Sequence, residues 1–174
     1  TSDLGYVLFR KNGDVVKTDA EGSILSVFSL GANGGVRQGI ITNDGTYIVI
    51  GNSIREGQET YVWLRKADAQ GNILWDMNFT GGFQVSAVVN TVDRGCVLAG
   101  NWKNNFWLAR LDSNGNQQWS QNYAYGDPSD AHFIYSIAKT RDGGFILAGT
   151  GMWRSSGGMI PWLIKINAQG YEQW

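Results

Sequence analysis

The sequence predicts an all-β fold, a β-propeller of four-stranded antiparallel blades with about four blades in the chain. A Thr-x-Asp motif recurs with its Asp at positions 3, 44, 93 and 142, at separations of 41, 49 and 49 residues. A repeat of this length is typical of stacked supersecondary units. The 174 residues include 24 glycines and 8 tryptophans but only 2 prolines, as in a turn-rich, aromatic-rich β domain. No segment carries the apolar period of a helix.

Each repeat is expected to hold four short strands. The first is apolar, at residues 85–89 and 134–138. The Thr-x-Asp turn follows, and its glycine supplies the positive φ that a tight hairpin needs. The second strand is expected at 47–50, 96–99 and 145–148, and the third at 62–66, 106–111 and 162–166. An Asp-x-x-Gly turn then leads to the fourth. The predicted blades are residues 1–30, 34–80, 83–125 and 132–174.

Most of the prominent side chains recur at fixed positions and are therefore expected to be structural. Two tryptophan columns, which we expect to fill the gaps between blades, are Trp63, Trp107 and Trp162, and Trp75, Trp119 and Trp174. The turn carboxylates are expected to accept backbone N–H bonds, because no calcium-binding loop surrounds them. The single Cys96 lies in an apolar run and is expected to be buried.

The two ends of the chain interrupt the repeat. The first blade lacks its first strand, and the fourth repeat stops four residues before the point that repeats two and three reach. Three interpretations stay open: a closed four-bladed ring, half of a larger ring that self-associates through its unpaired edge blades, or a fragment of a longer propeller. The ragged ends favour a fragment or an assembling half.

Composition excludes several classes of function. A formal net charge of −1 gives no basis for binding nucleic acid or an anionic membrane, and no apolar run is long enough for a membrane span. No catalytic triad, phosphate loop or HExxH motif is present, so we expect no catalytic residues, no metal and no cofactor. His132 follows Asp130 closely, but a loop histidine is more often solvated or a local hydrogen-bonding group. Arg37, Ser86 and Tyr135 share a column in the first strands without forming a catalytic set.

The last repeat carries a family resemblance. Thr140-Arg141-Asp142-Gly143-Gly144-Phe145-Ile146-Leu147-Ala148-Gly149, followed by Trp162 to Trp174, resembles the repeats of secreted bacterial and archaeal β-propeller proteins. That resemblance implies an extracellular or cell-surface location and a role as a repeat module. Residues 68–75 and 112–119 also resemble the Asp-x-x-Gly-x-x-x-Trp element of quinoprotein-like propellers, in which catalysis comes from a bound quinone cofactor and a metal. The chain lacks the cysteine pair and acidic cluster of those enzymes.

The departures from the repeat lie in loops on one face of the predicted propeller. Variable loops on a rigid scaffold are where binding residues are expected, and the candidates are Trp102, Lys103, Trp153, Arg154, Tyr125 and Arg55. The leading hypothesis is a non-catalytic binding or scaffold module with a protein or glycan partner. A lectin-like module, with Trp102 and Trp153 stacking on sugars, is the second hypothesis, and part of a quinoprotein-like enzyme is the third.

Overall fold

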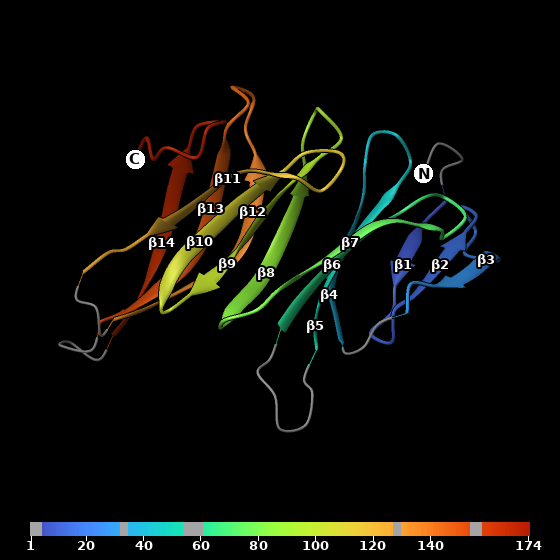
Figure 1. Cartoon of the computed structure of the whole chain (residues 1–174), viewed down its shortest axis with the longest axis horizontal. Coiled ribbons are helices and arrows are strands. Elements are labelled where there is room, and N and C mark those ends of the chain that lie inside the picture. The colour runs from blue at the N-terminus through green and yellow to red at the C-terminus, as the bar shows by residue number, and fades with distance from the viewer. Residues whose placement is uncertain (1–4, 32–34, 54–60, 127–129, 154–157) are drawn as a thin grey trace. The chain divides into compact units, whose positions relative to one another are not determined.

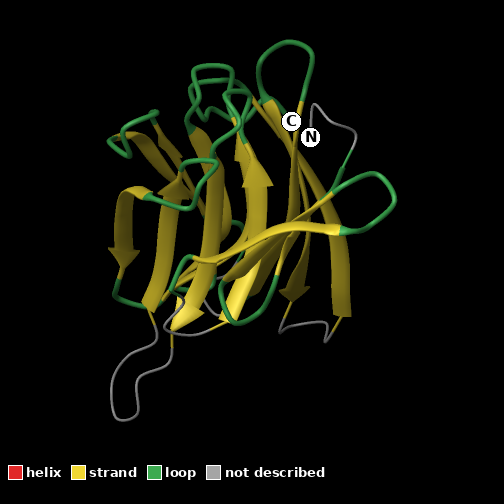
Figure 2. Cartoon of the chain, turned by 90° about the vertical axis from the view of Figure 1, so that its right-hand side faces the viewer, coloured by secondary structure: helices red, strands yellow, loops and turns green. Residues whose placement is uncertain are grey.

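The protein folds entirely into strands and turns in the residues that its structure describes. The computed structural model describes residues 5–31, 35–53, 61–126, 130–153 and 158–174. Within them, fourteen strands form four antiparallel sheets, and no helix occurs (Figure 2). No helix of this part of the chain could therefore cross a membrane. The prediction of an all-β fold is confirmed.

Each sheet uses strands that are consecutive in the chain, and neighbouring strands in the chain are neighbours in the sheet (Figure 1). The first sheet contains β1 (Val7–Phe9), β2 (Asp14–Thr18) and β3 (Ile24–Ser29), and the second contains β4 (Gly35–Ile41), β5 (Tyr47–Ser53), β6 (Tyr61–Ala67) and β7 (Ile73–Phe79). The third contains β8 (Phe83–Asn90), β9 (Cys96–Trp102), β10 (Asn105–Leu111) and β11 (Gln117–Tyr123). The fourth contains β12 (Ala131–Lys139), β13 (Phe145–Trp153) and β14 (Gly158–Ile166).

The chain divides into two compact units, Thr1–Gly81 and Gly82–Trp174, each with two sheets. In the first unit, Val15 and Leu30 of the β1–β3 segment pack against Val49, Trp63 and Ala67 of the β4–β7 sheet. Phe28 and Phe9 extend this contact onto the ring of Tyr47. The two sheets of the first unit thus pack face to face through apolar side chains, because each sheet has one apolar face and burying it removes apolar surface from water.

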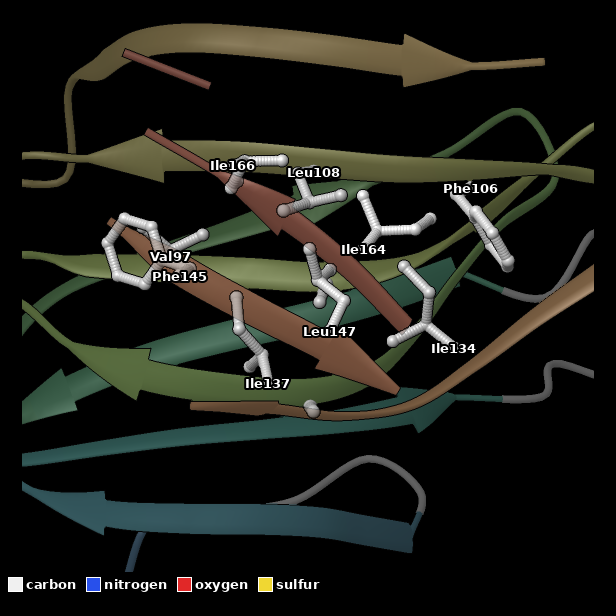
Figure 3. Close-up of a cluster of buried hydrophobic side chains, with 11 residues drawn as sticks. Val97, Phe106, Leu108, Ile134, Ile137, Phe145, Leu147, Ile164 and Ile166 are labelled. Atoms are coloured by element: carbon white, nitrogen blue, oxygen red, sulfur yellow. The ribbon is translucent and has the colours of Figure 1, made fainter. Parts of the chain in front are cut away.

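The second unit has the larger core (Figure 3). From the β8–β11 sheet come Ala87, Val97, Ala99, Phe106 and Leu108, and from the β12–β14 sheet come Ile134, Ile137, Phe145, Leu147, Ile164 and Ile166. All eleven are buried. This core fixes the ends of β9 and β10, where the candidate binding residues lie.

A glycine in the second strand allows the first strand to approach closely. Gly100 pairs with Val85 at a bulge formed around Ser86, and a Cβ at Gly100 would lie 1.9 Å from the carbonyl oxygen of Gln84. Gly149 stands in the same relation to the carbonyl of Phe133, at 2.1 Å. The column of Arg37, Ser86 and Tyr135 marks the bulged position of three first strands, which explains why these residues share a column.

The recurring turn residues form hydrogen bonds within their own turns. Asp68 and Asp112 each accept two backbone N–H bonds through Oδ1, and Asn167 takes the same role in the fourth sheet. In the Thr-x-Asp turn of the fourth sheet, Asp142 accepts a hydrogen bond from the N–H of Gly144. Its Oδ2 also lies 2.8 Å from Nζ of Lys165. The prediction that these carboxylates are structural is confirmed here. Asp3 lies outside the described residues.

Three of the recurring tryptophans join neighbouring sheets, as predicted. Trp63 lies in the core of the first unit, and Trp162 contacts Phe106 across the core of the second. Trp119 donates a hydrogen bond from Nε1 to the carbonyl of Ala168, over 3.2 Å. Trp107 is buried, and its Nε1 donates a hydrogen bond to the hydroxyl of Ser120 in its own sheet. Trp174 is 62% exposed, so the prediction of packing does not hold for it in the structure. Cys96 is buried, as predicted.

Candidate binding surface

A two-residue turn joins β9 to β10 and determines where the first two candidate residues lie. Trp102 pairs with Asn105, and Lys103 and Asn104 between them have φ of 48° and 67°. Positive φ at both central residues is the mark of a type I′ hairpin turn, whose twist matches that of the strands. Trp102 therefore ends a regular strand at a tight hairpin instead of lying in a long loop.

Trp102 belongs to a small group of side chains that we call the Trp102 platform, composed of Phe83, Trp102 and Lys103. Phe83 faces Trp102 across the β8–β9 pair, and their rings stack at 5.4 Å between centroids and 11° between planes. Phe83 also contacts the buried ring of Trp107, at 4.9 Å. Nζ of Lys103 lies 4.6 Å from the centroid of the Trp102 ring, within cation–π range. The platform combines a half-buried aromatic ring with an exposed positive charge.

His132 anchors the hairpin turn to the neighbouring sheet. Its backbone N–H donates to the carbonyl of Asn104 over 2.9 Å, and Nε2 lies 2.7 Å from the carbonyl oxygen of Tyr125. A carbonyl can only accept, so Nε2 carries the proton. The residue is 1% exposed. His132 is thus a buried hydrogen-bonding group and not a solvated one.

Tyr125, whose carbonyl accepts the hydrogen bond from His132, packs its ring against two other aromatic rings. The ring centroid is 4.5 Å from that of Trp162 and 5.9 Å from that of Phe106, and the hydroxyl donates to the carboxylate of Glu172. Burial raises the pKa of the Tyr125 hydroxyl well above its usual range, and the hydrogen bond to Glu172 acts in the same direction. Tyr125 holds the two sheets together, which sequence alone did not predict.

The structure brings only part of the predicted set together. Trp102 and Lys103 share the platform, and Tyr125 is connected to the same turn through His132. Trp153 ends β13 opposite Gly158, but its side chain lies outside the described residues, as do Arg154 and Arg55. Sequence reasoning missed Phe83. The signal available for it was its position in the first strand, opposite Trp102 in the β8–β9 hairpin.

Two further properties of the described residues bear on chemistry. No three His, Cys, Asp or Glu side chains lie together as a group that could hold a metal ion. Tyr135, from the bulge column, is exposed, and its hydroxyl lies 2.9 Å from the hydroxyl of Thr150.

Known proteins share the fold at low sequence identity. A protein of unknown function from Bacteroides caccae matches 95% of this chain with 58% of its own length, at 13% identity and a TM-score of 0.58. A mutant of the Synechocystis apocarotenoid oxygenase matches 97% of the chain with 46% of its own length, at 13% identity and a TM-score of 0.53. The chain thus spans about half the length of these structures. No protein-family model and no curated protein matches the sequence. The likeness concerns the fold alone.

Proposed function

We propose that the chain is a non-catalytic binding module of an exported or cell-surface protein, with its four sheets arranged as blades of a β-propeller. It recognises its partner through the Trp102 platform. The propeller arrangement is supported by the repeat, by the order of strands within each sheet, and by the face-to-face packing of consecutive sheets inside each unit.

The observation that carries the proposal is the stacking of Trp102 on Phe83 next to the exposed Lys103. A tryptophan held by a stacked ring loses little conformational entropy when a partner covers it, and tryptophan is a frequent hot-spot residue in interfaces. The anchoring of Phe83 on buried Trp107 keeps the platform fixed before binding. Preorganisation of this kind supports recognition, because less ordering has to be achieved on binding.

The charge beside the ring indicates the chemistry of the partner. Lys103 is exposed, and the residues that flank it, Trp102 and Asn104, bring no opposite charge. An acidic group on a partner can pair with Nζ while an apolar or aromatic group covers the indole. We therefore favour an acidic, aromatic-containing segment of a protein. A carbohydrate is the alternative ligand, because an indole beside asparagine side chains also suits a sugar ring.

Peptide and glycan arrays probed with the purified chain test this proposal. Binding to acidic, aromatic-containing peptides is expected for the wild type, with at least about a tenfold loss in Trp102→Ala and a clear loss in Lys103→Glu. Tyr171→Ala is the matched control, because Tyr171 is an exposed aromatic residue outside the platform. Circular dichroism verifies that each variant is folded.

Three outcomes would contradict the proposal in different ways. Binding that survives Trp102→Ala would place the site elsewhere. Binding to glycans alone, lost in Trp102→Ala, would favour the carbohydrate alternative. Substrate turnover that depends on added quinone cofactor and metal would favour the enzyme alternative.

A further inference from the structure

The β9–β10 turn, which carries Lys103 of the Trp102 platform, has a backbone conformation that lysine disfavours. Lys103 and Asn104 have φ of 48° and 67°, both in the left-handed region. Asparagine tolerates this region better than lysine, in which Cβ comes too close to the following carbonyl. Contacts from outside the hairpin are therefore expected to hold the turn in place.

Such a contact comes from β12 in the neighbouring sheet. The N–H of His132 donates to the carbonyl of Asn104 over 2.9 Å. The ring of His132 lies 5.4 Å, between centroids, from the ring of Phe106, the second residue of β10 after the turn. The backbone and the side chain of one residue thus reach both the turn and the strand that leaves it.

The side chain of His132 is itself fixed by the residues around it. Its Nε2 lies 2.7 Å from the carbonyl oxygen of Tyr125, to which it donates, and its ring centroid is 6.1 Å from that of Tyr125 and 5.7 Å from that of Trp162. Only 1% of the residue is exposed. A close-packed ring with a directional hydrogen bond has one position, so β12 offers the turn a rigid support at this point.

Gly151, which pairs with His132 across β12 and β13, leaves the space next to the imidazole. A Cβ at Gly151 would lie 2.9 Å from Nδ1 of His132 and 2.8 Å from Nε1 of Trp162. Cβ atoms essentially never come within 3.0 Å of another heavy atom, so an alanine would displace the two rings. Gly151 therefore offers a second way to move His132 without altering the turn.

The first unit contains a similar contact without a histidine. The N–H of Val36 in β4 donates to the carbonyl of Lys11, in the turn between β1 and β2, over 3.1 Å. In both units the first strand of one sheet holds a turn of the sheet before it in the chain. The buried imidazole is what the fourth sheet adds to this contact.

We infer that His132 is a positioning residue of the Trp102 platform. It holds the β9–β10 turn from the neighbouring sheet, and it thereby keeps Lys103 over the indole before a partner binds. The inference rests on the proposed function, because it assigns the residue that prepares that same site. A partner that meets an ordered platform loses less conformational entropy on binding. His132 is buried and acts only through the turn.

Two substitutions of His132 separate its hydrogen bond from its volume. His132→Leu keeps an apolar side chain but removes the donor to Tyr125, whereas His132→Gln can place an amide N–H near the position of Nε2. Affinity for a synthetic peptide of alternating glutamate and phenylalanine is expected to fall by roughly fivefold or more in His132→Leu and Gly151→Ala, and to be largely retained in His132→Gln. Phe145→Leu is the control, because Phe145 is buried at the opposite end of the β12–β13 pair and its truncation lowers stability without contacting the turn.

A second measurement needs no ligand. The ring current of Trp102 shifts the NMR signals of the Lys103 ε-methylene protons upfield while Nζ lies over the indole. This upfield shift is expected to decrease in His132→Leu and Gly151→Ala and to persist in His132→Gln and Phe145→Leu. Circular dichroism verifies that each variant is folded.

The two measurements keep this inference and the proposed function apart. An upfield shift that persists in folded His132→Leu and Gly151→Ala would overturn the positioning role, and so would a peptide affinity that neither substitution lowers. If the wild-type chain does not bind the peptide while the shift decreases as expected, the recognition proposal fails and the positioning of Lys103 by His132 stands.

Discussion

Substitution of Gly100 by alanine tests the close approach of the first two strands of the β8–β11 sheet. The added Cβ would lie 1.9 Å from the carbonyl oxygen of Gln84 and 2.8 Å from Cα of Val85. Cβ atoms in proteins essentially never come within 3.0 Å of such an atom, so the strands must separate by about 1 Å. The obstructing atoms belong to the backbone and cannot rotate away, while Val85 and Ala87 are buried on either side.

Adding a methylene to a well-packed core costs about 1–3 kcal/mol, and a clash with backbone belongs at the upper end, near about 3 kcal/mol. For a chain of this size that lowers the melting temperature by about 6–12 °C. Gly35→Ala is the matched control, because Gly35 is also in a strand and its Cβ would meet only side-chain carbons of Lys11 at 3.8 Å. Urea and thermal denaturation followed by circular dichroism measure both variants. Equal stability of Gly100→Ala and Gly35→Ala would refute the close approach.

Three further predictions concern the turns and the contact between sheets. Burial would raise the pKa of Asp44, but hydrogen bonds from Thr42 and Thr46 lower it to about 2, so its contribution to stability is present above pH 3.8 and is lost as the pH falls toward 2. The free energy of unfolding, measured by urea denaturation, should therefore fall more steeply with decreasing pH in the wild type than in Asp44→Asn. Parallel pH dependences of the two proteins would contradict this. Arg94→Gly should raise the free energy of unfolding by about 1 kcal/mol, because Arg94 has a φ of 65° at a turn position where the equivalent turns carry Gly45 and Gly143. A lower melting temperature of the variant would contradict this prediction. Tyr123→Phe removes the hydroxyl that donates to the carbonyl of Gly170 and should cost about 1 kcal/mol in the same assay, whereas an unchanged midpoint would show that this bond does not join the sheets.

The sequence predicted the positions of most strands because each repeat carries its own turn chemistry, although the β1–β3 and β12–β14 sheets have three strands each and four were expected in the latter. The Asp-x-x-Gly turns and the Thr-x-Asp turns fix where each strand ends, and these local signals do not depend on the neighbouring sheets. The expected second strand at 96–99, for example, lies inside β9 (Cys96–Trp102). The second strand nevertheless extends further than predicted, to Trp102, because a two-residue turn follows it without a loop.

The candidate site was predictable only in part, since its geometry depends on register and on contacts far apart in the chain. The stacking of Phe83 on Trp102 follows from a pairing register that contains a bulge at Ser86. The packing of Tyr125 depends on Trp162, which lies 37 positions later in the chain. Neither relation leaves a periodic signal in the sequence, whereas the prominence of Trp102 as a departure from the repeat was visible.

Recognition at the Trp102 platform can be followed through the indole N–H resonances of the eight tryptophans. The resonance of Trp102 is assigned by its loss in Trp102→Phe, and the strongest array ligand is then titrated into the wild-type chain. If the ligand binds at the platform, we expect the Trp102 signal to shift in a saturable manner, while the signal of buried Trp107, whose ring contacts Phe83, moves much less. A saturable shift confined to other tryptophans, with the Trp102 signal unchanged, would contradict recognition at the platform.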